Sequence, residues 1–215
     1  MKLMVKKNGG SWSYIDDNGA VQKELHVDEA FNFSEGMAMI RLYSCIGYIN
    51  EKFKVVVEPK YGVYSSCFKE GRAVVCTPKA FDPNVQKYGY IDKYGKEVIP
   101  LIFEYANSFS EGVAGVQKND KWGVIDTRGN LVIDFKYDML SDCVNGLFLF
   151  AIDYKIGIMD KRGNELAVSK KIDEDIFHED IYDLFFNFEN LQLVKEKDAD
   201  WIIETNQGKV KLIRG

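Results

Sequence analysis

A ten-residue block recurs along the chain at a nearly constant interval, which constrains the fold more than any other feature of the sequence. The block is clearest at 121–130, Lys-Trp-Gly-Val-Ile-Asp-Thr-Arg-Gly-Asn, and it aligns with 87–96 and 155–164. Two more copies begin at Trp12 and Ile46. Successive copies stand about 34 residues apart, except for one interval that is longer by about eight residues. This pattern predicts a repeat protein with an insertion in one repeat.

A second block, Phe-x-Glu-Gly, recurs out of phase with the first. Its copies begin at Phe33, Phe68 and Phe109, with a degraded copy at Cys143. The two landmarks together define one repeat domain over 1–215, with repeats at about 11–44, 45–77, 87–118, 121–152 and 155–196. We expect a degenerate cap around Trp201, over 197–215, because a terminal repeat must shield the array from solvent.

These landmarks resemble the Trp-Gly (WG) beta-repeat family, whose unit combines Lys-Trp-Gly-Tyr-Ile-Asp, a glycine turn, a Val-Ile-Pro strand and Phe-Ser-Glu-Gly. The resemblance covers residues from about 11 to 165. Other residues take the tryptophan position in three copies: Ile46, Tyr88 and Ile156. The resemblance implies a bacterial interaction module of β-repeats, with no catalytic residues to transfer.

Residue alternation predicts an all-β fold. In 122–126, Trp122 and Val124 share one strand face and Ile125 lies on the other, so the strand is expected to be buried on both sides. Gly123 would let a neighbouring backbone or ring approach closely, although an open ligand slot is the alternative. We expect five to six three-stranded antiparallel meanders. Their length of about 34 residues favours an open curved array over a propeller.

A column of acidic or amide residues follows each Trp-Gly strand, at Asp16, Asn50, Asp92, Asp126 and Asp160. In four copies a glycine follows three residues later, which is typical of a tight turn in which the carboxylate accepts backbone N–H groups. A metal track is the weaker alternative, because one acid per repeat lacks the ligand density of a calcium loop.

Composition narrows the class of function. The chain has 28 basic and 33 acidic residues, a net charge of −5 and no stretch of signal-peptide or membrane-spanning character, so we expect a cytoplasmic protein. The acidic balance disfavours nucleic acid and favours a protein partner with a basic surface. No catalytic motif surrounds His26 or His178, and the four cysteines make no metal-type pair. Neither a cofactor nor a metal is expected.

Two insertions are candidate contact sites, since insertions in repeat arrays form loops on one face. The first spans 77–86 and carries Phe81. The second spans 173–190, where apolar spacing over 176–188 predicts a short amphipathic helix. The acids of the second insertion are Asp173, Glu174, Asp175, Glu179, Asp180 and Asp183. It would either cap the array or bind a basic partner.

The leading functional hypothesis is a non-catalytic protein-interaction module, such as a bacterial immunity or adaptor-like protein. The alternative is a small-ligand or glycan binder, in which an aromatic of one repeat and a polar turn of the next form a slot. A weaker third hypothesis is an enzyme that uses dispersed acids such as Asp92 and Asp126, although their spacing gives it no support.

Overall fold

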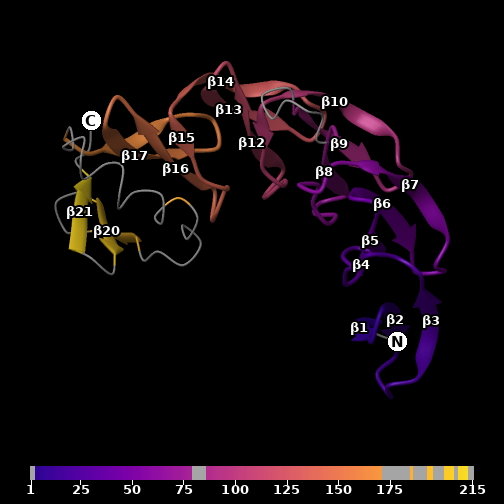
Figure 1. Ribbon diagram of the computed structural model, residues 1–215. Coiled ribbons are helices and arrows are strands. Elements are labelled where there is room, and N and C mark those ends of the chain that lie inside the picture. Colours follow the sequence, from indigo (N-terminus) through magenta and orange to yellow (C-terminus); the bar gives the residue numbers. More distant parts are fainter. Residues whose placement is uncertain are drawn as a thin grey trace. The chain divides into compact units, whose positions relative to one another are not determined.

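The computed structural model describes residues 3–78, 86–170, 185, 193–195, 201–205 and 208–212. Over these residues the chain is all-β, in small antiparallel sheets of three or four strands, none of which closes into a barrel (Figure 1). Within this described part, no helix has the length and apolar character needed to cross a bilayer. The chain divides into two compact units, Met1–Glu104 and Tyr105–Gly215.

The first unit contains three sheets. The first has the order β1-β2-β3, with bounds Met4–Asn8, Ser11–Ile15 and Val21–Leu25. The second has the order β4-β5-β6-β7, with bounds Glu29–Ala30, Met37–Leu42, Cys45–Asn50 and Val55–Tyr61. The third has the order β8-β9-β10, with bounds Arg72–Cys76, Tyr88–Asp92 and Glu97–Phe103.

The second unit repeats this plan. One sheet has the order β11-β12-β13-β14, with bounds Tyr105–Ala106, Val113–Lys118, Lys121–Asp126 and Leu131–Tyr137. The next has the order β15-β16-β17-β18, with bounds Met139–Leu140, Leu147–Ile152, Lys155–Asp160 and Glu165–Val168. A last sheet, β19-β20-β21, has bounds Leu193–Lys195, Trp201–Thr205 and Gly208–Leu212, of which β20 and β21 lie within 197–215, where the degenerate cap was predicted.

The predicted antiparallel meanders are present, but three of the described sheets have four strands, and each sheet from β1 to β18 begins one or two strands before the sequence repeat does. The strand after Phe-x-Glu-Gly forms a hairpin with the following Trp-Gly strand, as β12 does with β13, and the β-branched strand β14 closes the sheet. A sequence repeat that begins at a Trp-Gly strand therefore supplies strands to two successive sheets. This offset ties neighbouring sheets together through the chain itself. The predicted open array, as opposed to a ring, stays a prediction.

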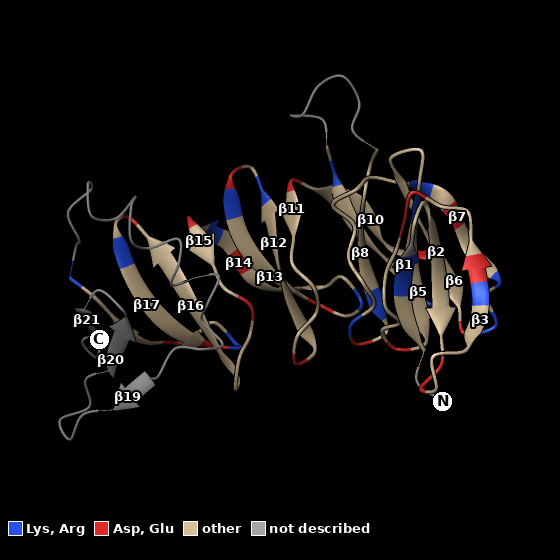
Figure 2. Cartoon of the chain, turned by 60° about the horizontal axis from the view of Figure 1, so that its bottom comes forward, with Lys and Arg blue, Asp and Glu red and all other residues tan. Residues whose placement is uncertain are grey.

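The core lies between neighbouring sheets within each unit, and it buries both faces of the Trp-Gly strands as predicted. In the first unit, Tyr48 of β6 faces a cluster that contains Val75 and Ile91 of the next sheet. Ile49, the next residue along β6, faces the cluster of Tyr14 and Ala30 on the other side. Charged residues instead gather at turns and strand ends and along the exposed strand β3 (Figure 2).

Of the predicted helix over 176–188, the structure describes Phe185 alone, and the rest of that prediction lies outside the described residues. Phe185 has helical backbone and is 7% exposed. Its side chain belongs to a cluster with Leu149, Ile156 and Ala167 of the β15–β18 sheet. One aromatic residue from the second insertion thus covers part of the face of that sheet.

Candidate functional site

The insertion residues predicted to contact a partner lie outside the described residues: Phe81, Asp173, Glu174, Asp175, Glu179, Asp180 and Asp183. Only the two ends of the first insertion are described. Gln86 donates from Nε2 to the carbonyl oxygen of Thr77 at 3.3 Å, and the backbone N–H of Lys87 donates to Thr77 Oγ1 at 3.0 Å. These bonds join the two ends of the loop at one end of the β8-β9-β10 sheet.

The Phe-x-Glu-Gly blocks form two-residue hairpin turns. In the first, Ser34 and Met37 exchange two backbone hydrogen bonds of 2.8 and 3.0 Å, and Glu35 and Gly36 between them both have positive φ, 52° and 82°. The same geometry recurs at Lys69–Arg72, Ser110–Val113 and Val144–Leu147. Such a turn leaves the N–H groups of its two central residues without partners inside the turn.

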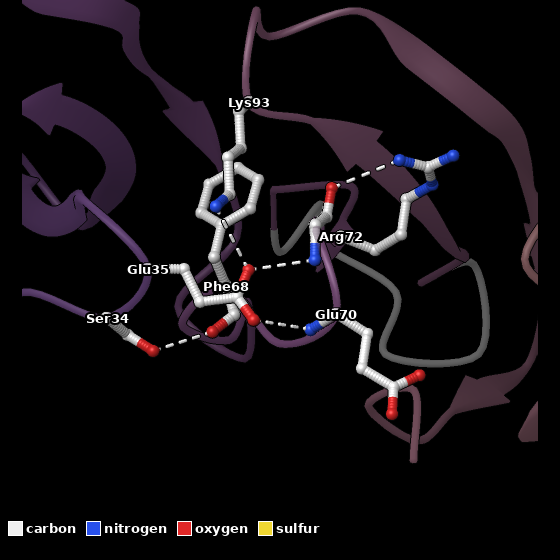
Figure 3. A network of polar contacts seen from close by, with 7 residues as sticks. Ser34, Glu35, Phe68, Glu70, Arg72 and Lys93 are labelled. Carbon is white, nitrogen blue, oxygen red and sulfur yellow. Dashed lines mark hydrogen bonds and ion pairs between the residues drawn. The ribbon is translucent and has the colours of Figure 1, made fainter. Parts of the chain in front are cut away.

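In the first unit, the glutamate of one turn binds the next turn. The carboxylate of Glu35 accepts the N–H of Glu70 at 2.7 Å and that of Gly71 at 2.8 Å (Figure 3). Lys93 adds an ion pair to Glu35 at 3.2 Å, and Ser34 Oγ donates to the carbonyl oxygen of Phe68 at 2.6 Å. We name this set of contacts the inter-repeat clamp, because it joins two successive sheets through the turns at the ends of their strands.

The second unit contains an equivalent inter-repeat clamp. Ser110 Oγ donates to the carbonyl oxygen of Cys143 at 2.8 Å, and Glu111 Oε2 accepts the N–H of Gly146 at 2.8 Å. Lys161 pairs with Glu111 at 3.5 Å. Burial, and secondarily the charge of Glu111, raises the pKa of the Cys143 thiol to about 12, so this cysteine is a neutral part of the clamp.

The clamp of the first unit stabilises the charged form of Glu35. The N–H of Gly71 is the largest cause that lowers the pKa of Glu35, and Lys93 and the N–H of Glu70 act in the same direction against a desolvation effect. A carboxylate that accepts two N–H groups is held as an anion at neutral pH. The carboxylate of Glu35 therefore serves to join two repeats.

The predicted Asp-x-x-Gly turns are confirmed. Asp126 Oδ1 accepts the N–H groups of Arg128 and Asn130, both at 2.9 Å, and the N–H of Gly129 donates to the carbonyl oxygen of Asp126 at 2.9 Å. The same bonds surround Asp16, Asp92 and Asp160. Asn50 keeps this role although Phe53 replaces the glycine with a φ of 55°. These acids cap turns, which accounts for their recurrence.

The glycine of the Trp-Gly pair makes room for a bulge in the outer strand. Between the pairs Val124↔Ile133 and Trp122↔Tyr137, the three residues 134–136 oppose Gly123 alone. A Cβ on Gly123 would lie 2.8 Å from the carbonyl oxygen of Ile133, and one on Gly89 would lie 2.6 Å from two carbonyl oxygens. At Gly157 the approaching group is the ring of Phe150. The predicted close approach of a backbone or ring is confirmed.

The first repeat supports this explanation by its exception. Ser13 replaces the glycine, and it pairs in ordinary register with Glu24 of β3, so the bulge found opposite Gly123 is missing here, while the second register shift, between Tyr14 and Ile15, is retained. Ser13 is 1% exposed, and its hydroxyl has no hydrogen-bond partner. The side chain at this position is therefore accommodated only where the outer strand does not bulge over it.

Exposed aromatic residues lie at the ends of the first unit's sheets. Tyr43, in the β5–β6 turn, is 85% exposed, and Tyr94, in the turn after β9, is 89% exposed. Val63 and Tyr64 follow β7 and are 39% and 57% exposed. Gly62, just before them, donates its N–H to the carbonyl oxygen of Cys76 at 2.8 Å, beside the root of the first insertion. Tyr43, Val63 and Tyr64 thus occupy the sheet end that carries this insertion, whereas Tyr94 lies at the clamp end.

The sequence reasoning missed the inter-repeat clamp and the surface of Tyr43, Val63 and Tyr64. The signal for the clamp was present, since a serine and a glutamate recur together beside a glycine, in a turn that leaves its two central N–H groups without partners inside the turn. No periodic signal marks the surface, because tyrosine does not recur at the positions of Tyr43 and Tyr64: the turn position of Tyr43 is taken by Asn119 in the repeat of β12 and β13.

The repeat geometry agrees with the comparison to known families. The model of the WG containing repeat matches four segments, at residues 12–43, 46–77, 88–122 and 122–155. The chain belongs to this family. Each matched segment begins at or near a Trp-Gly strand, so the WG unit spans two successive sheets in this WG-repeat protein.

Solved structures are similar to this chain at low sequence identity. Hsv2 of Kluyvelomyces marxianus is 12% identical with a TM-score of 0.54, over 95% of this chain and 80% of that one. The extracellular domain of a hybrid two-component system from B. thetaiotaomicron is 14% identical with a TM-score of 0.40, over 95% of this chain and 32% of that one. Regucalcin, a calcium-binding protein from Agrobacterium tumefaciens, is 11% identical with a TM-score of 0.36, over 95% of this chain and 82% of that one. No curated protein matches the chain.

Proposed function

We propose that this WG-repeat protein is a non-catalytic module that binds another protein, in an adaptor or immunity role. The observation that carries the proposal is that the repeated polar residues bind backbone groups of the protein itself. Glu35, Glu111 and the turn acids accept backbone N–H groups, so their lone pairs and charge serve the scaffold. Function in such a scaffold is left to loops and other positions outside the repeat pattern.

In this proposal, the loops of the module contact the partner. The two insertions depart from the repeat period, and the second carries acids that suit a partner with a basic surface. A cytoplasmic location is part of the proposal, and it is supported by the four free cysteines: Cys45, Cys67, Cys76 and Cys143.

Affinity purification of the full tagged chain from its native host tests this function. A partner should co-purify with the wild type and be lost, at low salt, from the double variant Asp180→Lys and Asp183→Lys. The matched control is Glu24→Lys with Glu58→Lys, which makes the same change of charge at exposed positions of β3 and β7. Absence of any co-purifying protein from the wild type would refute the function. Equal loss from both double variants would refute the role of the acidic insertion.

A further inference from the structure

Tyr43 has a backbone conformation that costs free energy. It is the first central residue of the β5–β6 turn, with a φ of 49°, followed by Ser44 with a φ of 62°. Turns of this kind prefer Asn, Asp or Gly, and the equivalent turn after β12 has Asn119 and Asp120. A bulky residue at positive φ is strained.

Other bulky residues at positive φ gain a contact that offsets this strain. Phe53 packs against Tyr14 and Phe33, with ring centroids 5.6 and 6.3 Å apart. Glu35 and Glu111 form the inter-repeat clamps. The ring of Tyr43, by contrast, is 85% exposed, although the carboxylate of Asp28 holds its backbone N–H at 2.7 Å. The scaffold thus fixes the turn and gains nothing from the phenol ring.

Four of the charged groups described beside this sheet end form two ion pairs. Arg41 pairs with Glu29 at 3.0 Å next to the β5–β6 turn, and Lys87 pairs with Glu104 at 3.7 Å at the corresponding end of the next sheet. Lys60 lies over the ring of Tyr61, 4.9 Å from its centroid, and the Asp28 carboxylate accepts the backbone N–H of Tyr43. These described charges are of both signs and already have contacts, so the surface beside them fits an uncharged protein surface better than a basic one.

From these observations, and resting on the proposed function, we infer that Tyr43, Val63 and Tyr64 form a contact surface for an uncharged, apolar patch of a protein partner. Tyr43 is its anchor, because a fixed aromatic ring supplies contact area at little cost in conformational entropy. Contacts here are insensitive to salt, unlike those of the acidic insertion. The two surfaces are therefore experimentally separable.

Site-specific photo-crosslinking in the native host tests the inference. A benzoyl-phenylalanine probe replaces Tyr43, or Tyr94 as the matched position of equal exposure at the clamp end. The expected result is an adduct from position 43 with one identified polypeptide, at least about tenfold stronger than from position 94, because anchors concentrate binding energy. Tyr64→Ala should weaken this adduct several-fold, because it removes apolar contact area from the same surface.

Several results would overturn the inference: no adduct from position 43, equal adducts from both positions, an adduct only with a second copy of this chain, or no effect of Tyr64→Ala. The variant Tyr43→Asn completes the test, because Asn suits the turn and keeps the fold. A partner that co-purifies equally with wild type and Tyr43→Asn would refute this surface and leave the proposed function standing. Absence of any partner would refute both.

Discussion

Replacement of Glu35 by alanine tests whether the inter-repeat clamp holds two sheets of the first unit together. The variant loses the acceptor of two backbone N–H groups, at 2.7 and 2.8 Å, and the ion pair to Lys93 at 3.2 Å. Hydrogen bonds to a charged group contribute about 1.5 to 3 kcal/mol each when shielded from water. The Glu35 side chain is 34% exposed, so we roughly halve that sum and add at most about 1 kcal/mol for the ion pair.

The expected loss in the free energy of unfolding is therefore about 1.5 to 4 kcal/mol for Glu35→Ala, and about half of that for Glu35→Gln, whose amide oxygen keeps one N–H. Urea denaturation followed by tryptophan fluorescence measures it, provided that one cooperative transition is seen. Glu58→Ala, at an exposed position of β7, is the matched control and should change stability by less than about 0.5 kcal/mol.

The pH dependence supplies an independent check. The pKa of Glu35 is lower in the folded protein than its usual value, so the folded state gains stability from this group above its unfolded pKa. That gain is lost as the pH falls through the folded pKa. The difference in stability between wild type and Glu35→Gln should thus be constant near neutral pH and shrink below about pH 4. A Glu35→Ala variant as stable as Glu58→Ala, or a difference that grows in acid, would refute the clamp.

Three further predictions concern the core and the turns. Gly89→Ala should destabilise the protein by about 3 kcal/mol in urea denaturation, because its Cβ would lie 2.6 Å from two carbonyl oxygens. Ser13→Ala removes a buried unpaired hydroxyl and should be neutral or stabilising. Equal effects of the two variants would contradict the role of the glycine. Tyr43→Asn should raise the free energy of unfolding by about 0.5 to 1 kcal/mol, and a loss would show that the turn is not strained. Phe185→Ala should lower it by about 3 kcal/mol through a cavity against Leu149 and Ile156, and a change below about 0.5 kcal/mol would show that this ring does not cover the sheet.

Much of the local structure could be predicted from residue type. The Asp-x-x-Gly turns depend on one carboxylate and backbone groups within four residues, as the bonds of Asp126 show, so they follow from adjacent residues alone. The close approach at Gly123 was predictable from residue type as well, because a glycine beside an aromatic residue in a strand usually marks a place where another backbone or ring comes close.

The sheet boundaries and the inter-repeat clamp were not predictable in this way. The sequence does not state whether the strand after Phe-x-Glu-Gly pairs with the strand before it or with the strand after it in the chain. In the structure it pairs with the strand after it, because the turn at Asn119 and Asp120 joins β12 to β13 in a hairpin. Glu35 lies 35 residues from the N–H group of Glu70, and nothing in the spacing of the two motifs states that one binds the other.

The period, the all-β class and the turns follow from the order of the residues, because these features depend on alternation and on contacts between near neighbours. Which repeat a side chain serves depends instead on how the sheets pack in space. The Glu35 carboxylate accepts an N–H group in the turn of the next sheet, and the Ser34 hydroxyl donates to the carbonyl oxygen of Phe68 beside that turn. Phe185 covers the face of a sheet that precedes it in the chain. The physical reason is that an unsatisfied N–H group or an exposed apolar face is filled by whatever lies nearest in space, and proximity in space is a property of the packed sheets.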